Sequence, residues 1–280
     1  MERILLIDGS NLLFQMFYGM PARIAGANGK AIQGTLGFVG ALLKIVRMTE
    51  PAYMAVLFDG ECTNPRTELD EAYKANRPDY ARMPEEDTPF SQLPDIYAAL
   101  DALGICHAET TDCEADDWLA GYALRYGGAY AVTIASQDSD LFQLISENVR
   151  VLRYRGEKTV LCDRAYIWDK LGVTPEQYAA FKSLTGDSSD HIRGADKIGP
   201  KTAAALLNQF PDLEGMIAGA GEIRRPSVRE SVLRNAARLR LNYLLIKLTG
   251  TTELPFDLPE MVWQYKGQTT TEVLRAIGLR

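Results

Sequence analysis

Three short apolar runs, each ending in acidic residues, constrain the fold of this chain more than any other feature. The runs cover 3–7, 53–58 and 130–135, and they lead into Asp8, into Asp59, and into Asp138 and Asp140. Continuous apolar runs of this length are typical of strands buried on both faces, as in parallel sheets. Helical patterns fall between or after them at 34–48, 93–103 and 114–125, and a further strand is expected at 149–154. The alternation predicts an α/β fold with a mostly parallel central sheet flanked by helices.

Composition limits the class of protein. With 280 residues and 46% hydrophobic content, the chain can bury a large core, as one domain or as two unequal ones. The net charge of −7 excludes a globally basic nucleic-acid binder. Local basic patches would still permit contact with DNA, because metal ions bound by carboxylates reverse the field around them.

Cysteine and histidine usage gives no sign of a zinc site. The four cysteines are scattered without a Cys-x-x-Cys pair, and His107 and His191 are the two histidines. The N-terminus lacks the layout of a signal peptide, and no apolar run reaches the roughly 18 residues that span a bilayer. We therefore expect a cytoplasmic protein with reduced thiols and no membrane partner.

Two changes of pattern suggest how the chain is divided. Residues 63–87 are polar and rich in proline, and they carry the cations Arg66, Lys74, Arg77 and Arg82. A polar segment of this length inside a compact domain is usually functional or disordered. From Thr174 onward the pattern predicts helices only. We therefore predict an α/β unit at 1–182 and a smaller helical unit at 183–280.

The acidic residues are expected to converge at one edge of the sheet. Asp8, Asp59, Asp138 and Asp140 follow strands, and ligands of open α/β sheets bind outside the carboxyl ends of the strands. Glu114, Asp116 and Asp117 fall at the start of a helix, for which Asp112 is the predicted cap. Taken singly, such residues are equally well explained by helix-dipole or turn preferences.

The combination of these acids favours a metal site. Carboxylates that converge repel one another unless cations neutralise them. Oxygen ligands without a histidine cluster indicate Mg²⁺ or Mn²⁺ rather than zinc. Two such ions roughly 4 Å apart stabilise the attacking and the leaving oxygen in phosphoryl transfer. The expected chemistry is hydrolysis by a metal-activated water.

Two further motifs lie in the helical unit. Gly186-Asp187-Ser188-Ser189-Asp190 adds an acidic pair, although by itself it is explained as an Asx turn or a helix cap. The run from Ala195 to Thr202 contains Ile198-Gly199-Pro200-Lys201-Thr202 before a helical pattern. A glycine turn that opens a helix presents backbone N–H groups to a phosphate, as in a helix-hairpin-helix. Six arginines make the later region locally basic without indicating a particular contact: Arg224, Arg225, Arg229, Arg234, Arg238 and Arg240.

In their order and spacing, these motifs resemble the 5′-nuclease family, which includes the N-terminal nuclease domain of bacterial DNA polymerase I and the phage and flap endonucleases. The resemblance covers nearly the whole chain. It rests on Leu-Ile-Asp8-Gly-Ser-Asn, Leu-Phe-Asp59-Gly, Tyr73-Lys74-x-x-Arg77-Pro78, Glu114-Ala-Asp116-Asp117, Asp138-Ser-Asp140, Leu184-Thr-Gly-Asp187-Ser-Ser-Asp190 and Ile198-Gly-Pro-Lys-Thr-Ala. It implies a PIN-like nuclease core followed by a helical unit with a helix-hairpin-helix.

The resemblance also implies a role for each matching residue. Asp8, Asp59 and Asp116 would hold a first metal, with Glu114 close by. Asp138, Asp140 and Asp190 would hold a second, with Asp116 bridging, while Asp117 and Asp187 orient the cluster or its waters. Residues 63–87 would form the helical arch of the family, called here the arch segment, in which Tyr73, Lys74 and Arg77 serve catalysis and the two cations meet the scissile phosphate. Ile198, Gly199, Lys201 and Thr202 would bind duplex DNA, with K⁺ as a further candidate ion.

The implied function is that of a structure-specific 5′-3′ exonuclease and flap endonuclease. We expect a stand-alone monomer that serves DNA replication or repair and acts on DNA with 5′ ends, flaps or single-strand/duplex junctions. The alternatives are a catalytically weak DNA-binding protein and a PIN-like ribonuclease. Two departures from the family pattern stand out. Gln15 replaces a customary arginine, and the hairpin lacks the Pro-Gly that usually precedes its Ile-Gly. Asp196 would then lie next to a phosphate, which is unfavourable.

Overall fold

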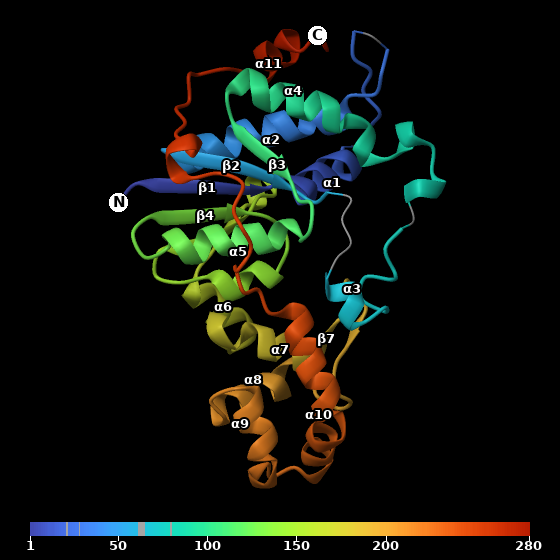
Figure 1. Cartoon of the computed structure of the whole chain (residues 1–280), viewed down its shortest axis with the longest axis vertical. Coiled ribbons are helices and arrows are strands. Elements are labelled where there is room, and N and C mark those ends of the chain that lie inside the picture. Colours follow the sequence, from blue (N-terminus) through green and yellow to red (C-terminus); the bar gives the residue numbers. More distant parts are fainter. Residues whose placement is uncertain (21, 28, 61–64, 79) are drawn as a thin grey trace.

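A six-stranded sheet forms the centre of the α/β unit (Figure 1). The computed structural model describes residues 1–280 except 21, 28, 61–64 and 79, so that Cys62 and the beginning of the arch segment lie outside the described residues. The strands are β1 (Arg3–Asp8), β2 (Tyr53–Phe58), β3 (Cys106–Glu109), β4 (Ala131–Ala135), β5 (Val149–Arg153) and β6 (Val160–Cys162). Their order is β3-β2-β1-β4-β5-β6, and only the β5–β6 pair is antiparallel within this sheet.

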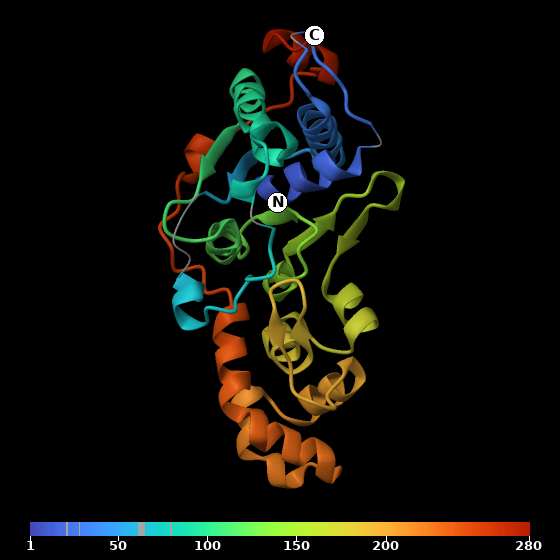
Figure 2. The ribbon, with the colours of Figure 1, turned by 90° about the vertical axis from the view of Figure 1, so that its right-hand side faces the viewer.

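Helices cover both faces of the sheet because its strands alternate apolar residues on both sides. Leu5 and Ile7 of β1 pack in one core cluster, and Ile4 and Leu6 pack in another. The sheet-covering helices of the first cluster are α1 (Gly9–Gly19), α2 (Gln33–Thr49) and α4 (Leu93–Leu103). Those of the second are α5 (Ala115–Tyr126) and α6 (Arg164–Leu171), and this cluster continues into the helices of residues 178–246. Figure 2 shows the sheet between these two layers.

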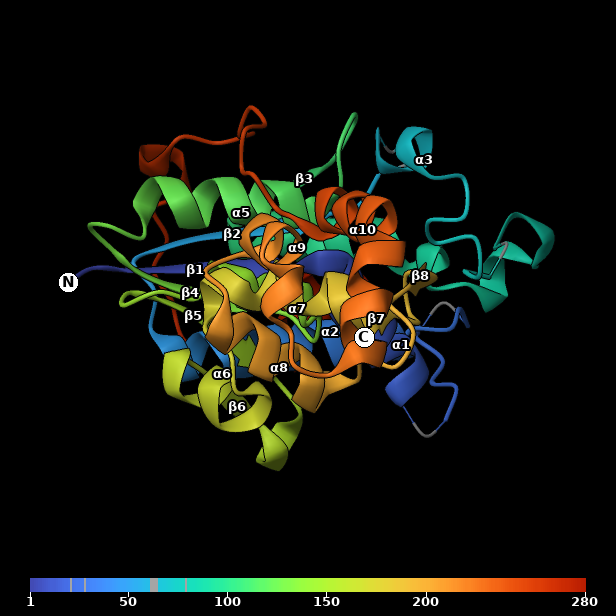
Figure 3. The ribbon, with the colours of Figure 1, turned by 90° about the horizontal axis from the view of Figure 1, so that it is seen from below.

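The second part of the chain is mainly helical and lies below the sheet in Figure 1. It contains α7 (Tyr178–Thr185), α8 (Pro200–Gln209), α9 (Leu213–Ala218) and α10 (Pro226–Ile246). Seen from below, α8, α9 and α10 lie in front of the sheet (Figure 3). Between α7 and α8 the chain forms a small antiparallel hairpin of β7 (Gly186–Asp187) and β8 (Ile192–Arg193).

Short helices make up the remaining elements. The arch segment contains α3 (Pro65–Leu69) and two 3₁₀ turns, and α11 lies near the C-terminus. The 3₁₀ turns and this last helix are η1 (Tyr80–Arg82), η2 (Glu85–Asp87), η3 (Pro89–Gln92), η4 (Asp140–Leu144), η5 (Gly156–Lys158), η6 (Pro175–Gln177), η7 (Ala220–Glu222), η8 (Leu258–Met261) and α11 (Thr270–Ala276).

After α10 the chain returns to the α/β unit. The Trp263 backbone N–H donates to the Ala52 carbonyl oxygen at 2.9 Å, and its ring Nε1 donates to the Leu103 carbonyl oxygen at 2.9 Å. Helix α11 then packs against α2 and α4, where the C-terminus lies in Figure 1. Residues 249–280 therefore rest on the α/β unit although they follow the helical part in sequence.

The predicted fold class is confirmed, and the strands expected at 3–7, 53–58, 130–135 and 149–154 are present within a residue at each end. Two predictions about local structure are wrong. Glu114, not Asp112, caps α5, because Glu114 and Asp117 form a reciprocal capping box. The region after Thr174 is not purely helical, since Gly186 at φ +80° turns the chain into the β7–β8 hairpin. No helix among the described residues is long and apolar enough to cross a membrane.

Candidate metal centre

The site lies where the order of the sheet reverses. From β1 the chain adds β2 and β3 on one side, and it then returns to place β4 and β5 on the other. The carboxyl ends of β1 and β4 flank this switch point, where α/β sheets open a crevice for ligands. Asp8 is the last residue of β1, and Asp138 follows β4 by three residues.

Hydrogen bonds fix the acids that end β1 and β2. Asp8 caps α1 by accepting from the Asn11 backbone N–H at 3.0 Å, and it also accepts from Ser136 Oγ at 2.8 Å. Asp59 accepts from the Ala115 backbone N–H at 2.9 Å and thereby joins β2 to the start of α5. Each acid is thus held in place by the loop of a neighbouring strand.

A cluster of acids at the start of α5 completes what we call the first carboxylate group: Asp8, Asp59, Glu114, Asp116 and Asp117. Arg66 of α3 binds three of its members. Its guanidinium contacts Glu114, lies 3.3 Å from Asp116 Oδ1, and donates to Asp117 Oδ1 at 2.6 Å. The Arg66 side chain is only 10% exposed, so this cation is an internal counter-charge rather than a surface residue.

The arch segment adds a second cation to Glu114. Lys74 Nζ forms an ion pair with Glu114, and the Tyr73 hydroxyl donates to Glu114 Oε2 at 3.2 Å. Tyr73 and Lys74 lie in a turn rather than in the helix that the family pattern implied, and Lys74 has a left-handed φ of +57°. A non-glycine residue in this conformation is strained and marks a functional candidate.

The second carboxylate group contains Asp138, Asp140, Asp187 and Asp190. Carboxylate oxygens of Asp140, Asp187 and Asp190 lie within 4.8 Å of one another, as metal ligands would. Lys182 of α7 pairs with Asp187 and lies 3.9 Å from Asp140 Oδ1. Asp138 accepts from the Asp140 backbone N–H at 2.8 Å, which joins it to the same turn.

Backbone contacts connect the arch segment to the second carboxylate group. The Lys74 N–H donates to the Asp190 carbonyl oxygen at 3.0 Å, and Asn76 Nδ2 donates to the Ser188 carbonyl oxygen at 2.9 Å. Arg77 Nη2 lies 3.4 Å from Asp190 Oδ1. The predicted catalytic residues Tyr73, Lys74 and Arg77 therefore lie between the two carboxylate groups.

Burial and mutual repulsion perturb these acids. Burial and then the neighbouring Asp59 raise the pKa of Asp8 to about 7. Burial and then Asp138 raise the pKa of Asp140 to about 8. Burial also raises the pKa of Asp116, Asp117 and Asp190 despite the nearby cations. The pKa of Asp187 is lowered, because hydrogen bonds from Lys182 and Ser189 outweigh the effect of burial.

The donor set fits hard divalent cations. A cavity of about 470 Å³ is lined by acids of both groups and by cations of the arch segment, among them Asp8, Asp59, Asp116, Asp138, Lys74 and Arg77. Asp140 Oδ1 is buried without a hydrogen-bond partner, as expected of an oxygen that awaits a ligand. Carboxylate oxygens are the ligands that Mg²⁺ and Mn²⁺ prefer.

The predicted DNA-binding turn, residues 198–202, follows β8 and leads into α8, whereas Asp187 lies in β7 and Asp190 lies in the turn between β7 and β8. Gly199 caps α8, Pro200 is its first residue, and Lys201 is exposed in its first turn. Ile198 is 4% exposed and belongs to the main core, whereas Thr202 is half-buried. Ile198 thus anchors the turn, while Gly199 and Lys201 face solvent.

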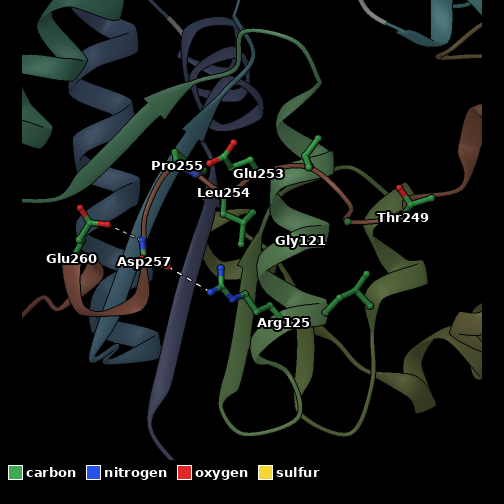
Figure 4. Close-up of a pocket in the computed structure, with 11 residues that line it drawn as sticks. Gly121, Arg125, Thr249, Glu253, Leu254, Pro255, Asp257 and Glu260 are labelled. Atoms are coloured by element: carbon green, nitrogen blue, oxygen red, sulfur yellow. Dashed lines mark hydrogen bonds and ion pairs between the residues drawn. The ribbon is translucent and has the colours of Figure 1, made fainter.

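Another cavity, of about 600 Å³, lies between α5 and residues 249–260 (Figure 4). Arg125 and Asp257 pair there at 3.5 Å, and Glu260 accepts from the Asp257 backbone N–H. None of its lining residues lines the carboxylate cavity. It is therefore separate from the candidate metal centre.

Sequence reasoning missed two internal cations and two hydroxyls. Arg66 was noted only as one cation of a polar segment, and Lys182 only as a boundary. A single sequence does not show whether a lysine or arginine is buried or solvated, so it gave no signal that Arg66 or Lys182 is internal. Ser10 follows the end of β1 by two residues and accepts from the Asp59 backbone N–H at 2.8 Å, and Ser136 follows β4 directly and accepts from the Asp138 backbone N–H at 3.0 Å. Their positions next to strand ends were the available signal.

Comparison with known families and curated proteins gives a consistent result. The family model described as "5'-3' exonuclease, N-terminal resolvase-like domain" matches residues 3–172, and "5'-3' exonuclease, C-terminal SAM fold" matches residues 173–269. DNA polymerase I of Rhizobium leguminosarum is 36% identical over 93% of this chain and 26% of its own length. The thermostable DNA polymerase I of Thermus aquaticus is 35% identical over 91% of this chain and 29% of its own. The chain thus spans under a third of these relatives.

Solved structures show the same fold. The T5 5′-exonuclease with bound divalent metal ions (zinc) has a TM-score of 0.72 at 21% identity, over 88% of this chain and 90% of that one. A T5 flap endonuclease in a pseudo-enzyme-product complex with DNA and metal ions has a TM-score of 0.72 at 20% identity, over 99% of both chains. The catalytic core of Rad2 with a DNA substrate has a TM-score of 0.57 at 14% identity, over 99% of this chain and 92% of that one.

The role of Arg66 as counter-charge can be tested by Arg66→Met. Removing one partner of a buried ion cluster typically costs about 3–5 kcal/mol, so the metal-free variant should melt at a clearly lower temperature than the wild type. Mg²⁺ should raise the Tm of the variant more than that of the wild type, because it neutralises the same acids. Thermal denaturation in EDTA and in Mg²⁺ measures both effects.

The matched control is Arg164→Met, which breaks the exposed pair with Glu176, whose side chains are 39% and 63% exposed. Exposed pairs contribute little, so the Tm of this variant should stay near that of the wild type. Equal losses of Tm in the two variants would contradict an internal role for Arg66.

The raised pKa values predict how stability changes with pH. In the unfolded chain Asp8 and Asp140 lose their protons near pH 3.8, whereas in the folded protein they keep them to about pH 7 and 8. The folded state binds more protons in between, so metal-free protein loses stability as the pH rises from about 4 to about 8. Mg²⁺ binds the deprotonated acids, and its stabilising effect should therefore grow over the same range. If Mg²⁺ raises the Tm by as much at pH 5 as at pH 8, the predicted growth of its effect with pH is contradicted.

Proposed function

The chain belongs to the 5′-3′ exonuclease family, and from this membership we propose that it hydrolyses DNA phosphodiesters as a structure-specific 5′-3′ exonuclease and flap endonuclease. Its substrates would be DNA with 5′ ends, flaps or junctions of single strand and duplex. The observation that carries the proposal is the cavity in which Asp8, Asp59, Asp116 and Asp138 face Lys74 and Arg77. Phosphodiester cleavage needs this pairing of metal-binding acids with cations that stabilise developing negative charge.

We assign the carboxylates to two ions, Mg²⁺ or Mn²⁺. Asp8, Asp59 and Asp116 would hold the first, with Glu114 close by. Asp138, Asp140 and Asp190 would hold the second, while Asp117 and Asp187 orient the cluster. When bound, the ions supply a water of lowered pKa and neutralise charge on the phosphate oxygens. Ser136 serves both groups, because its hydroxyl donates to Asp8 and accepts from the Asp138 backbone N–H.

When substrate binds, the side chains of Lys74 and Arg77 would leave their carboxylate partners and contact the scissile phosphate. Without substrate they pair with Glu114 and Asp190. The Lys74 side chain is only 14% exposed. Burial alone lowers the pKa of its ammonium group, but the interactions with Glu114 and the other nearby acids together outweigh this and raise it, so the group stays charged. Once the acids hold divalent cations, the two side chains are free to contact the phosphate. Cations placed there stabilise the transition state more than the ground state.

The helical unit would hold the duplex next to this site. We propose that residues 183–280 form the DNA-binding unit, with its contacts at the hairpin and the N-terminus of α8 rather than in residues 249–280, which lie on the α/β unit. Gly199, Lys201 and Thr202 would meet the backbone of the duplex, with Ile198 as anchor and K⁺ as a further candidate ion. Backbone contacts at a helix N-terminus position DNA without reading its sequence.

Cleavage of a 5′-labelled flap duplex tests the activity directly. Wild-type protein should cut near the junction with Mg²⁺ or Mn²⁺ and not with EDTA. Asp138→Asn removes one charge from the second carboxylate group and should lower the cleavage rate by about a thousandfold or more, as the loss of a principal catalytic group does. Wild type that binds the flap but never cuts it with either metal would support a DNA-binding protein instead. Cleavage confined to RNA would support a ribonuclease.

Two lysines should separate catalysis from binding. Lys74→Ala removes a cation from the cavity and should mainly lower the single-turnover rate. Lys201→Ala removes an exposed cation from the hairpin and should mainly raise the Kd for duplex DNA, with a weaker dependence on salt. Anisotropy in EDTA gives the Kd, and rapid-quench cleavage gives the rate. A fall in rate with unchanged binding for both variants would contradict this division.

A further inference from the structure

The turn that carries Asp196 is fixed to α10 by buried polar residues. Ser231 Oγ donates to the Asp196 carbonyl oxygen at 2.5 Å, and Asn235 Nδ2 lies 3.3 Å from the same hydroxyl. Asn242 Nδ2 donates to the Arg193 carbonyl oxygen at 2.9 Å. These three α10 side chains are buried, so the turn and the helix form one surface of defined shape.

The Asp196 side chain lies at the centre of an arginine cluster on that surface. Its carboxylate is 3.0 Å from Arg193 Nη2 and 3.4 Å from Arg234 Nη2. Arg238 follows Arg234 by about one turn of α10 and is close enough, with the other two arginines, to lower the pKa of Asp196. The side chains of Arg193, Arg234 and Asp196 are 71%, 66% and 44% exposed, which leaves the cluster open to solvent.

The cluster adjoins the hairpin expected to contact duplex DNA. Lys197 follows Asp196 directly, and its left-handed φ of +64° turns the chain toward Gly199 and Lys201. An arginine that leaves an exposed carboxylate for a phosphate gives up little stability and gains a charge-assisted, often bidentate contact. The three arginines are therefore available to a phosphate backbone, whereas Asp196 repels it.

We propose that Arg193, Arg234 and Arg238 extend the hairpin into a duplex-binding surface, and that Asp196 limits the affinity of this surface for duplex DNA. With Asp196 the cluster carries a charge of +2, and without it the charge is +3, three arginines less one aspartate. The restraint acts on the contact that every duplex offers. A flap substrate and a blunt duplex both offer this contact, so Asp196 weakens the binding of both by a similar factor. This inference rests on the proposed function.

The test uses Asp196→Asn and a matched control, Glu214→Gln. Glu214 is also an exposed acid paired with an α10 arginine, because Arg240 Nη2 lies 2.7 Å from it. Arg240 is six residues beyond Arg234, or about 120° around the helix, and so faces away from the Asp196 cluster. Both substitutions remove one negative charge, and they differ in whether that charge lies on the proposed surface.

Anisotropy of a blunt duplex and of a flap duplex of equal length is measured in EDTA over a range of KCl concentrations. Asp196→Asn should tighten binding of the blunt duplex by about threefold or more at low salt, with a steeper salt dependence. It should tighten binding of the flap duplex by a similar factor, while Glu214→Gln leaves both affinities near those of the wild type. Arg234→Gln should weaken binding of both duplexes. Thermal denaturation confirms that each variant is folded.

Three results would overturn the inference. Unchanged or weaker duplex binding by Asp196→Asn would show that the acid has no effect or orders the arginines for DNA. An equal gain in Glu214→Gln would reduce the effect to net charge. Wild-type affinity in Arg234→Gln would remove the arginines from the surface. If the wild-type protein binds no duplex, the proposed function is refuted. If the wild type binds duplex and Asp196→Asn binds it equally well, only the inference about Asp196 is refuted.

Discussion

Repulsion between buried carboxylates is the constraint on which the rest of this structure depends. The parallel strands bring acids from distant parts of the sequence to one edge of the sheet, where burial raises the pKa of Asp8, Asp116 and Asp140. Part of the repulsion is offset by the protein's own cations. Arg66 and Lys74 offset part of the charge of the first carboxylate group, and Lys182 offsets part of that of the second.

These cations also join the parts of the chain. Arg66 and Lys74 come from the arch segment, and Lys182 comes from α7, so the electrostatic balance of the centre depends on elements outside the sheet. Divalent ions at the acids would release Lys74 and Arg77 while the arch segment stays attached through backbone contacts, such as that from the Lys74 N–H to Asp190. Metal binding and the presentation of cations to a phosphate would thus be coupled.

The sequence predicted the centre of the sheet well because β1, β2 and β4 are continuous apolar runs that lead into acids. It missed β3 and β6, which are edge strands of four and three residues, and the β7–β8 hairpin, whose strands have two residues each. It placed Asp8, Asp59, Asp116 and Asp138 where the structure brings them together. It could not identify Arg66 or Lys182, because their burial depends on tertiary packing. It flagged Asp196 as unfavourable for a phosphate but could not place the arginines around it.

Diffraction from crystals soaked in Mn²⁺ at about pH 8 tests the central claim most directly, since the anomalous signal of manganese locates each ion. We predict one peak at coordination distance from Asp8, Asp59 and Asp116, and a second at Asp138, Asp140 and Asp190. The Lys74 and Lys182 ammonium groups should then have moved away from their carboxylates. A site without manganese, with Arg66, Lys74 and Lys182 still paired to the acids, would contradict the claim that these carboxylates form a metal centre.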